Sequence, residues 1–127
     1  MRVLLIEDDP QLRSNFVEML HDGGFDVDGL ANAEDALVLL GAGQIPDVLV
    51  TDINLGLGLD GIELANMARA KHPEVGVVFI TGGPIDQQRY RLREHEQFLQ
   101  KPFSYAELIR SIQGTSAATF EPREGNV

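Results

Sequence analysis

The sequence predicts an open α/β fold, in which helices cover both faces of a five-stranded parallel sheet with the strand order 2-1-3-4-5. Segments typical of strands and of helices alternate five times along the chain, as they do in parallel-sheet proteins. The inner strand segments are short apolar runs rich in β-branched residues, which is typical of strands buried on both faces. Right-handed crossovers leave few topologies for five such strands, and this order is a common one.

The length and composition fit one compact domain. The chain has 127 residues, of which 43% are hydrophobic, which is enough for one core and argues against disorder. No apolar run approaches the roughly 20 residues that span a bilayer. We expect residues 1–114 to form the domain and residues 115–127 to be a flexible C-terminal tail.

The charge and the absence of cysteine restrict the possible partners. Ten basic and twenty acidic residues give a net charge of -10, which disfavours binding to nucleic acid or to anionic membranes. Without cysteine the chain has no disulfides and no thiolate metal ligands. The N-terminus lacks the pattern of a signal peptide. These features fit a cytoplasmic protein that binds a divalent cation or a partner with a basic face.

The first two predicted strands flank a capped helix. Residues 3–6 are an apolar run that predicts the first strand. Asp9 before Pro10 is a preferred helix start, and Gly23 ends that helix. Residues 25–30 alternate apolar and acidic side chains, as expected for a half-exposed edge strand.

A second helix and the central strand come next. Asn32 is a preferred N-cap, and the helix that it starts stops at Gly41. The apolar residues 48–50 then run almost directly into Asp52. This carboxylate therefore stands at the carboxyl end of a strand that is buried on both faces.

A capping box marks the third helix. Asp60 as N-cap, with Glu63 three residues later, predicts that the helix begins there, and His72 closes it. Residues 75–80 are almost wholly apolar and predict a fourth strand, which leads into Thr81.

The last part of the chain contains the least clear segment and one of the clearest. Residues 86–96 are polar and charged, and they predict only a short, weakly packed helix. Residues 97–100 predict a brief fifth strand. Ser104 and Glu107 then form a capping box for the final helix, which Gly114 ends.

Polar residues stand at the carboxyl ends of four of these strands. Because the carboxyl ends of parallel strands lie on one edge of a sheet, residues far apart in the sequence are gathered there. The set contains three carboxylates, a hydroxyl and an ammonium group: Glu7, Asp8, Asp52, Thr81 and Lys101.

Few reactions use such a set of groups. Three clustered carboxylates offer hard oxygen ligands to Mg²⁺ or a similar cation, and an aspartate can attack phosphorus to form an aspartyl phosphate. The phosphoryl oxygens then need a metal, a cation such as Lys101 and a donor such as Thr81. No Ser/His/Asp set stands beside these residues, and solvated positions suit the three histidines better: His21, His72 and His95.

This arrangement resembles the receiver domain of two-component response regulators, over residues 2 to about 114. The motifs that carry the resemblance are Ile6-Glu7-Asp8, Asp52 after an apolar strand, Asp60-Gly61, Thr81-Gly82 and Lys101-Pro102-Phe103. The resemblance implies a flavodoxin-like receiver fold. It also implies a signalling switch that is not an enzyme, beyond assisting its own phosphorylation and dephosphorylation.

The resemblance implies a role for each residue of the cluster. Asp52 would be the phosphoacceptor. Asp8, Asp52 and the backbone carbonyl of Asn54 would hold Mg²⁺ or Mn²⁺, and Glu7 would contribute through water. Thr81 would bond a phosphoryl oxygen, and Lys101 would pair with the phosphoryl group.

Two more residues are implied by the same resemblance. Thr81 and Phe98 would form a switch, in which the hydroxyl moves inward on phosphorylation and the aromatic rotamer follows. A phenylalanine packed in the core is an equally good interpretation of Phe98. Pro102 is the candidate for a cis peptide bond, which would place Lys101.

The implied function is signalling in a phosphorelay. A histidine kinase or histidine phosphotransfer protein would donate the phosphoryl group, and the chain would act on an unknown downstream protein by contact. The chain is then a stand-alone receiver, or the receiver piece of a larger hybrid kinase or regulator. We expect this domain to bind neither nucleic acid nor a membrane.

Two other classes of protein stay open as alternatives. A small Mg²⁺-dependent phosphohydrolase forms an aspartyl phosphate on a similar sheet, but usually has a second aspartate two positions on, where this chain has Asn54. A flavodoxin-like cofactor carrier is disfavoured, because an acidic edge repels phosphate unless a metal is present.

Overall fold

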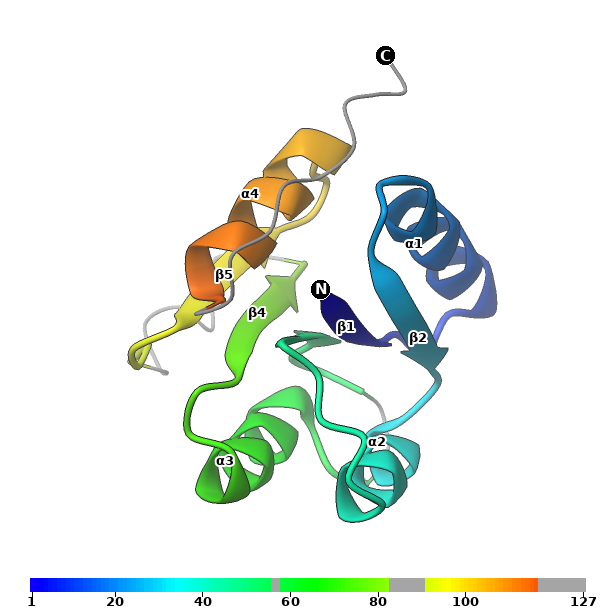
Figure 1. The fold of residues 1–127 in the computed structure, drawn as a ribbon. Coiled ribbons are helices and arrows are strands. Elements are labelled where there is room, and N and C mark those ends of the chain that lie inside the picture. Colours follow the sequence, from blue (N-terminus) through cyan, green and yellow to red (C-terminus); the bar gives the residue numbers. More distant parts are fainter. Residues whose placement is uncertain (56–57, 83–90, 117–127) are drawn as a thin grey trace.

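A computed structural model describes residues 1–55, 58–82 and 91–116 of the chain (Figure 1). In this part of the chain, five strands form one sheet in the order β2-β1-β3-β4-β5, and all neighbouring strands are parallel. The strands are β1 (Arg2–Ile6), β2 (Asp26–Leu30), β3 (Val48–Asp52), β4 (Gly76–Thr81) and β5 (Glu96–Gln100). The predicted fold class and strand order are confirmed.

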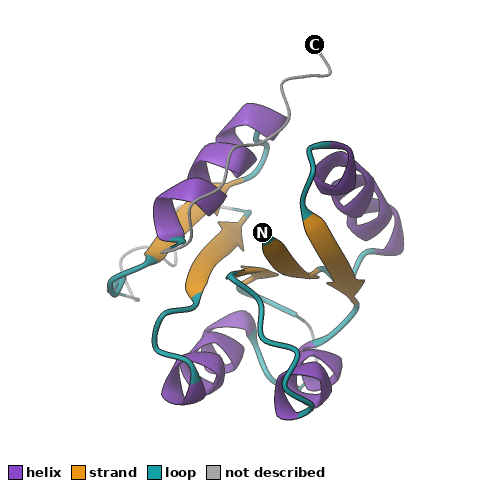
Figure 2. Ribbon diagram, in the orientation of Figure 1, coloured by secondary structure: helices purple, strands orange, loops and turns teal. Residues whose placement is uncertain are grey.

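Among the described residues, two helices cover each face of the sheet (Figure 1 and Figure 2). The helices are α1 (Pro10–Asp22), α2 (Ala33–Gly41), α3 (Gly61–Lys71) and α4 (Tyr105–Thr115). α1 and α4 pack around a core that includes Leu20 and Leu108, and α2 and α3 pack around one that includes Leu40 and Leu64. None of these four helices is both long and apolar enough to cross a membrane.

Side-chain caps start all four of these helices. Asp9 and Asn32 cap α1 and α2 by accepting hydrogen bonds from backbone N–H groups. Asp60 and Ser104 form complete capping boxes with the glutamates three residues later. Caps satisfy N–H groups that a helix start otherwise leaves unpaired, and each predicted helix start among these is confirmed. Because these helices follow strands, the caps also hold the chain at the carboxyl edge of the sheet.

The predicted helix over residues 86–96 is wrong in the part that the structure describes. Its first five residues lie outside the described residues, residues 91–95 are not helical, and β5 begins at Glu96. His95 has a φ of 64°, a left-handed conformation that does not occur inside a right-handed helix. The Glu96 carboxylate accepts a hydrogen bond from the Arg93 N–H at 2.8 Å, which closes a turn before the strand.

The C-terminal helix α4 ends at Thr115, one residue beyond the predicted end at Gly114. Thr115 is fully buried, and its hydroxyl donates to the Ile112 carbonyl at 3.0 Å. Residues 117–127, most of the predicted tail, lie outside the described residues. The division of the chain at residue 114 therefore stays a prediction.

A buried ion pair joins α3 to the start of β5. Arg69 Nη1 lies 2.5 Å from Glu96 Oε2, and the two side chains are 8% and 0% exposed. Arg69 Nη2 also donates to the Asn66 side chain at 2.6 Å. Removing one partner of such a pair lowers the stability of the protein more than replacing both partners with apolar residues, because the remaining buried charge has no water to solvate it.

We expect Arg69→Met to lower the free energy of unfolding by about 3 kcal/mol, because it leaves the Glu96 carboxylate buried without its cation. Urea unfolding followed by circular dichroism measures this change. The double variant Arg69→Met/Glu96→Leu removes both charges and should recover most of the loss. A double variant as unstable as the single one would contradict the role given to the buried charge.

Candidate phosphoacceptor site

The residues predicted to act together line one cavity at the carboxyl edge of the sheet. The cavity has a volume of about 330 Å³. Its lining includes six predicted site residues: Glu7, Asp8, Asp52, Asn54, Thr81 and Lys101. They come from the carboxyl ends of β1, β3 and β4 and from the loop after β5, so the parallel topology gathers them as expected.

Three carboxylates form the acidic part of this cavity. One oxygen each from Glu7, Asp8 and Asp52 lies within 4.8 Å of the others. Glu7 and Asp52 are buried, whereas Asp8 is exposed. Like charges at this separation repel one another unless a cation lies between them. Hard carboxylate oxygens are ligands that Mg²⁺ prefers, so the donor set fits a divalent cation.

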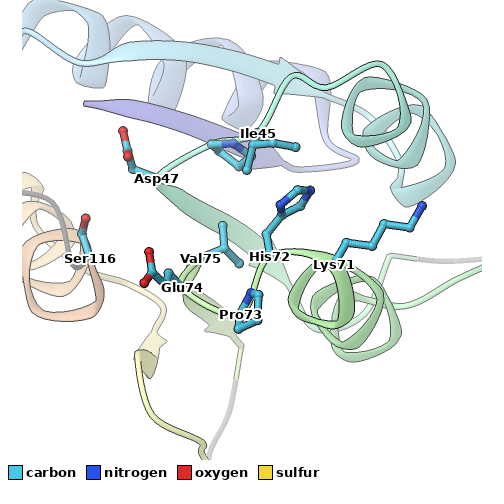
Figure 3. Close-up of a pocket in the computed structure, with 9 residues that line it drawn as sticks. Ile45, Asp47, Lys71, His72, Pro73, Glu74, Val75 and Ser116 are labelled. Atoms are coloured by element: carbon cyan, nitrogen blue, oxygen red, sulfur yellow. The ribbon is translucent and has the colours of Figure 1, made fainter.

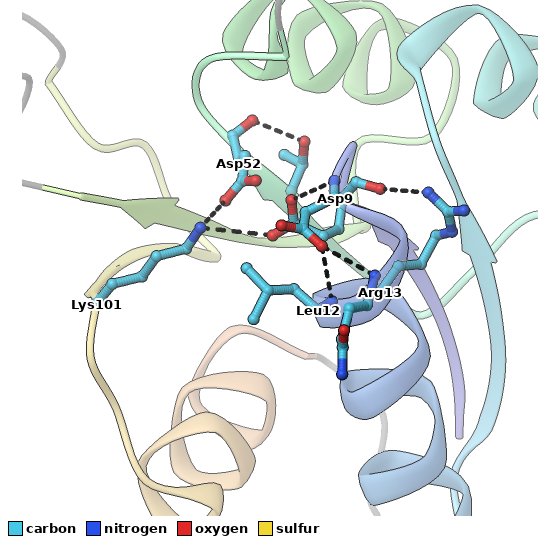
Figure 4. Close-up of polar contacts among 8 residues, drawn as sticks. Asp9, Leu12, Arg13, Asp52 and Lys101 are labelled. Atoms are coloured by element: carbon cyan, nitrogen blue, oxygen red, sulfur yellow. Dashed lines mark hydrogen bonds and ion pairs between the residues drawn. The ribbon is translucent and has the colours of Figure 1, made fainter.

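Lys101 supplies a positive charge to the cluster. Its Nζ lies 3.3 Å from Asp52 Oδ1 and 3.5 Å from Glu7 Oε1 (Figure 4). Burial acts to lower the pKa of Lys101, but the charges of Asp52 and Glu7 raise the pKa above its ordinary value. Lys101 therefore stays an ammonium group and bridges the two buried carboxylates.

The surroundings of Asp52 raise the pKa of its carboxyl group. Burial, the hydrogen bond with Glu7 and the charge of Glu7 raise the pKa of Asp52 from 3.8 to about 7, against the opposing effect of Lys101. Near neutral pH the group is therefore only partly ionised. A cation bound between the carboxylates would favour the ionised form, because it reverses the local charge.

Glu7 is held by contacts within the protein. Its Oε2 accepts a hydrogen bond from the Asp9 N–H at 3.1 Å, and its backbone carbonyl accepts one from Arg13 Nη1 at 2.9 Å (Figure 4). With Lys101 near Oε1, both carboxylate oxygens of Glu7 have partners. These contacts fix the turn that carries Asp8, which is exposed and lines the cavity.

Thr51 and Gly61 donate hydrogen bonds to the backbone carbonyls of Asp52 and Ile53. The Thr51 hydroxyl donates to the Asp52 carbonyl at 2.9 Å, and the Gly61 N–H donates to the Ile53 carbonyl at 2.8 Å. A Cβ atom at Gly61 would overlap the Asp52 carbonyl oxygen, so only glycine lets α3 start this close to β3. Thr51 is not among the predicted site residues, and its one sequence signal is a hydroxyl in an otherwise apolar strand.

The predicted switch residues lie on neighbouring strands. Thr81 ends β4 and is buried, and Phe98 lies half-buried in β5 with its ring centroid 5.9 Å from that of Phe79. This packing fits the core interpretation of Phe98, and its switch role stays a prediction. The peptide bond between Lys101 and Pro102 is cis.

A larger cavity, of about 620 Å³, lies at the opposite edge of the sheet (Figure 3). It is lined by residues 45–47 before β3, Lys71 at the end of α3, residues 72–75 between α3 and β4, and Ser116. None of the predicted site residues lines it, and His72 is the one histidine that does. Side-chain chemistry, rather than cavity size, therefore distinguishes the candidate site.

The sequence matches the family model of the response regulator receiver domain over residues 3–113. The chain therefore belongs to this family, and the resemblance carried by its motifs is confirmed. It is a receiver domain of the two-component signalling type.

The relatives by sequence are longer proteins. The chain is 32% identical over 110 residues to the nitrogen assimilation regulatory protein NtrX of Azorhizobium caulinodans, covering 84% of this chain and 24% of that protein. It is 32% identical over 117 residues to the transcriptional regulatory protein TrcR of Mycobacterium tuberculosis, covering 90% and 44%. The chain thus spans less than half the length of these two relatives.

Solved structures of receiver domains share the fold. A response regulator receiver protein from Sinorhizobium medicae WSM419 has a TM-score of 0.82 and 30% identity, covering 89% of this chain and 91% of that chain. The receiver domain of the hybrid histidine kinase CckA has a TM-score of 0.74 and 27% identity, covering 89% and 96%. The fold therefore occurs both in a receiver protein and in a hybrid kinase.

We expect Asp52→Asn to be more stable than the unsubstituted chain at pH 8 without metal, by about 1 kcal/mol. Because the pKa of Asp52 is raised from 3.8 to about 7, the folded protein binds more protons than the unfolded chain between these pH values. Its stability therefore falls as the pH rises through that range. Asparagine carries no charge, so the advantage of the variant should shrink as the pH falls toward 4.

Urea unfolding in EDTA, repeated between about pH 5 and pH 8, measures the difference in free energy. The control Asp26→Asn removes an exposed carboxylate from the edge strand β2. An advantage of Asp52→Asn that is the same at every pH would contradict the effect of the raised pKa.

Proposed function

We propose that this chain is a phosphorylation-controlled switch of a two-component phosphorelay, in which Asp52 accepts the phosphoryl group. The observation that carries the proposal is the buried Asp52 carboxylate, which shares a cavity with two further carboxylates and with the ammonium group of Lys101. Membership of the receiver family supports the same function.

The acidic cluster would hold Mg²⁺ or Mn²⁺. The proposed ligands are the carboxylates of Asp8 and Asp52 and the backbone carbonyl of Asn54. Glu7 would contribute through water, because both of its carboxylate oxygens already have partners within the protein. When bound, the cation neutralises the negative charge of the phosphoryl oxygens.

In the transfer, a carboxylate oxygen of Asp52 attacks the phosphorus of a phosphohistidine on the partner. The P–N bond breaks, its electron pair returns to the histidine nitrogen, and an acyl phosphate forms on Asp52. Lys101 pairs with the phosphoryl group, and the Thr81 hydroxyl donates to one of its oxygens.

The output would pass from Thr81 to the neighbouring strand. β4 and β5 are paired so that Phe79 lies opposite Phe98 and Thr81 lies opposite Gln100. A movement of Thr81 toward the acyl phosphate would change the packing around Phe98 and hence the surface of β5. Phosphorylation then biases a surface between two arrangements.

The donor would be a histidine kinase or a histidine phosphotransfer protein, and a downstream protein would recognise the phosphorylated surface by contact. The chain would act either alone or as the receiver piece of a larger regulator or hybrid kinase. The second alternative matches relatives such as NtrX, of which the chain spans less than half the length. Residues 1–114 would be the receiver domain in either case.

Incubation with acetyl phosphate and Mg²⁺, followed by mass spectrometry of the intact protein, tests the proposal. We expect a mass increase of one phosphoryl group that requires Mg²⁺ and is absent from Asp52→Asn. The control Asp26→Asn, which removes an exposed carboxylate away from the cavity, should take up phosphate like the unsubstituted chain.

An adduct that persists in Asp52→Asn, or that forms equally well in EDTA, would overturn the proposal. Rapid turnover of small phosphoesters that depends on Asp52 would instead favour the phosphohydrolase. Asn54 disfavours that alternative, because it stands where those enzymes usually have a second aspartate.

A further inference from the structure

We propose that Thr51 is a positioning residue for the cation site, which acts by holding the backbone carbonyl of Asp52. This inference rests on the proposed function, because it concerns the same site. It adds a residue that lies outside the cavity and would not touch the cation or the phosphoryl group itself.

Thr51 is a polar residue in a fully buried position. It is 0% exposed in β3, between the apolar Val50 and the acceptor Asp52. Leu49 and Ile53 pack in the core beneath α2 and α3, so the alternation of side chains along a strand puts Thr51 on that face. Its hydroxyl finds a partner in the carbonyl of the next residue, Asp52, at 2.9 Å.

The start of α3 completes this arrangement. The Gly61 N–H donates to the Ile53 carbonyl at 2.8 Å, and a Cβ at Gly61 would lie 3.1 Å from Thr51 Oγ1 and would overlap the Asp52 carbonyl oxygen. Two consecutive carbonyls, those of Asp52 and Ile53, thus accept hydrogen bonds on the face of the sheet that α3 covers. The next carbonyl along the chain belongs to Asn54, which lines the cavity.

The Thr51 hydrogen bond therefore fixes a peptide that lies between two proposed cation ligands, the Asp52 carboxylate and the Asn54 carbonyl. Valine has nearly the shape of threonine but cannot donate, so Thr51→Val leaves the buried Asp52 carbonyl without this donor. Rotation of the peptide to find another partner would move both ligands, and a metal site tolerates only small displacements.

A titration of the full chain with Mg²⁺ alone, followed by ¹⁵N NMR of the backbone amides, tests the inference without any phosphodonor. We expect Thr51→Val to weaken Mg²⁺ binding about tenfold, and Thr51→Ser, which keeps the hydroxyl, to stay within about twofold of the unsubstituted chain. Shifts of the Asn54 amide should report the same loss.

Thr115→Val is the matched control. Thr115 is also 0% exposed and its hydroxyl also donates to a backbone carbonyl, that of Ile112, at 3.0 Å. It packs against Gly76, the first residue of β4, and therefore lies near the amino edge of the sheet. We expect this variant to lose stability in urea as Thr51→Val does, with unchanged Mg²⁺ affinity.

Mg²⁺ affinity of Thr51→Val equal to that of the unsubstituted chain would overturn the inference, as would an equal loss in Thr115→Val or a tenfold loss in Thr51→Ser. If Thr51→Val does not fold, Thr51→Ala compared with Thr115→Ala applies the same criterion. If the unsubstituted chain does not bind Mg²⁺, the proposed cation site is wrong as well. If it binds Mg²⁺ and Thr51→Val binds equally well, only the inference about Thr51 is wrong.

Discussion

Repulsion between like charges is the constraint on which this structure depends. Parallel strands end at one edge of the sheet, and there the carboxylates of Glu7, Asp8 and Asp52 come within 4.8 Å of one another. Burial strengthens the repulsion, because little water screens it. Lys101 offsets part of it, and the fully buried strands β3 and β4 supply the apolar packing that keeps the groups together.

The sequence predicts best what local chemistry or topology determines. N-caps such as Asp9 and Ser104 accept hydrogen bonds from N–H groups at most three residues later in the chain. Their capping motifs are therefore visible in the local sequence. The gathering of Asp52 and Lys101 is predictable for a different reason. Parallel strands bring their carboxyl ends to one edge whatever the details of side-chain packing.

Contacts between distant segments could not be predicted in the same way. Glu96 is charged and stands in a polar segment, which favours a surface helix, but Arg69 on α3 pairs with it in the interior and β5 begins there instead. The bond from Thr51 depends on the course of the backbone after Asp52. The requirement for glycine at position 61 depends on how closely α3 approaches that backbone, which spacing along the sequence does not reveal.

The raised pKa of Asp52 has a consequence for how the site responds to its solution. A carboxyl group with a pKa of about 7 carries a proton in a large fraction of molecules at neutral pH. A divalent cation bound to this carboxylate would displace the proton, so the proposed cation site would exchange protons for cations. Acidification would then weaken cation binding, and the ionisation of Asp52 would follow both the pH and the concentration of free Mg²⁺.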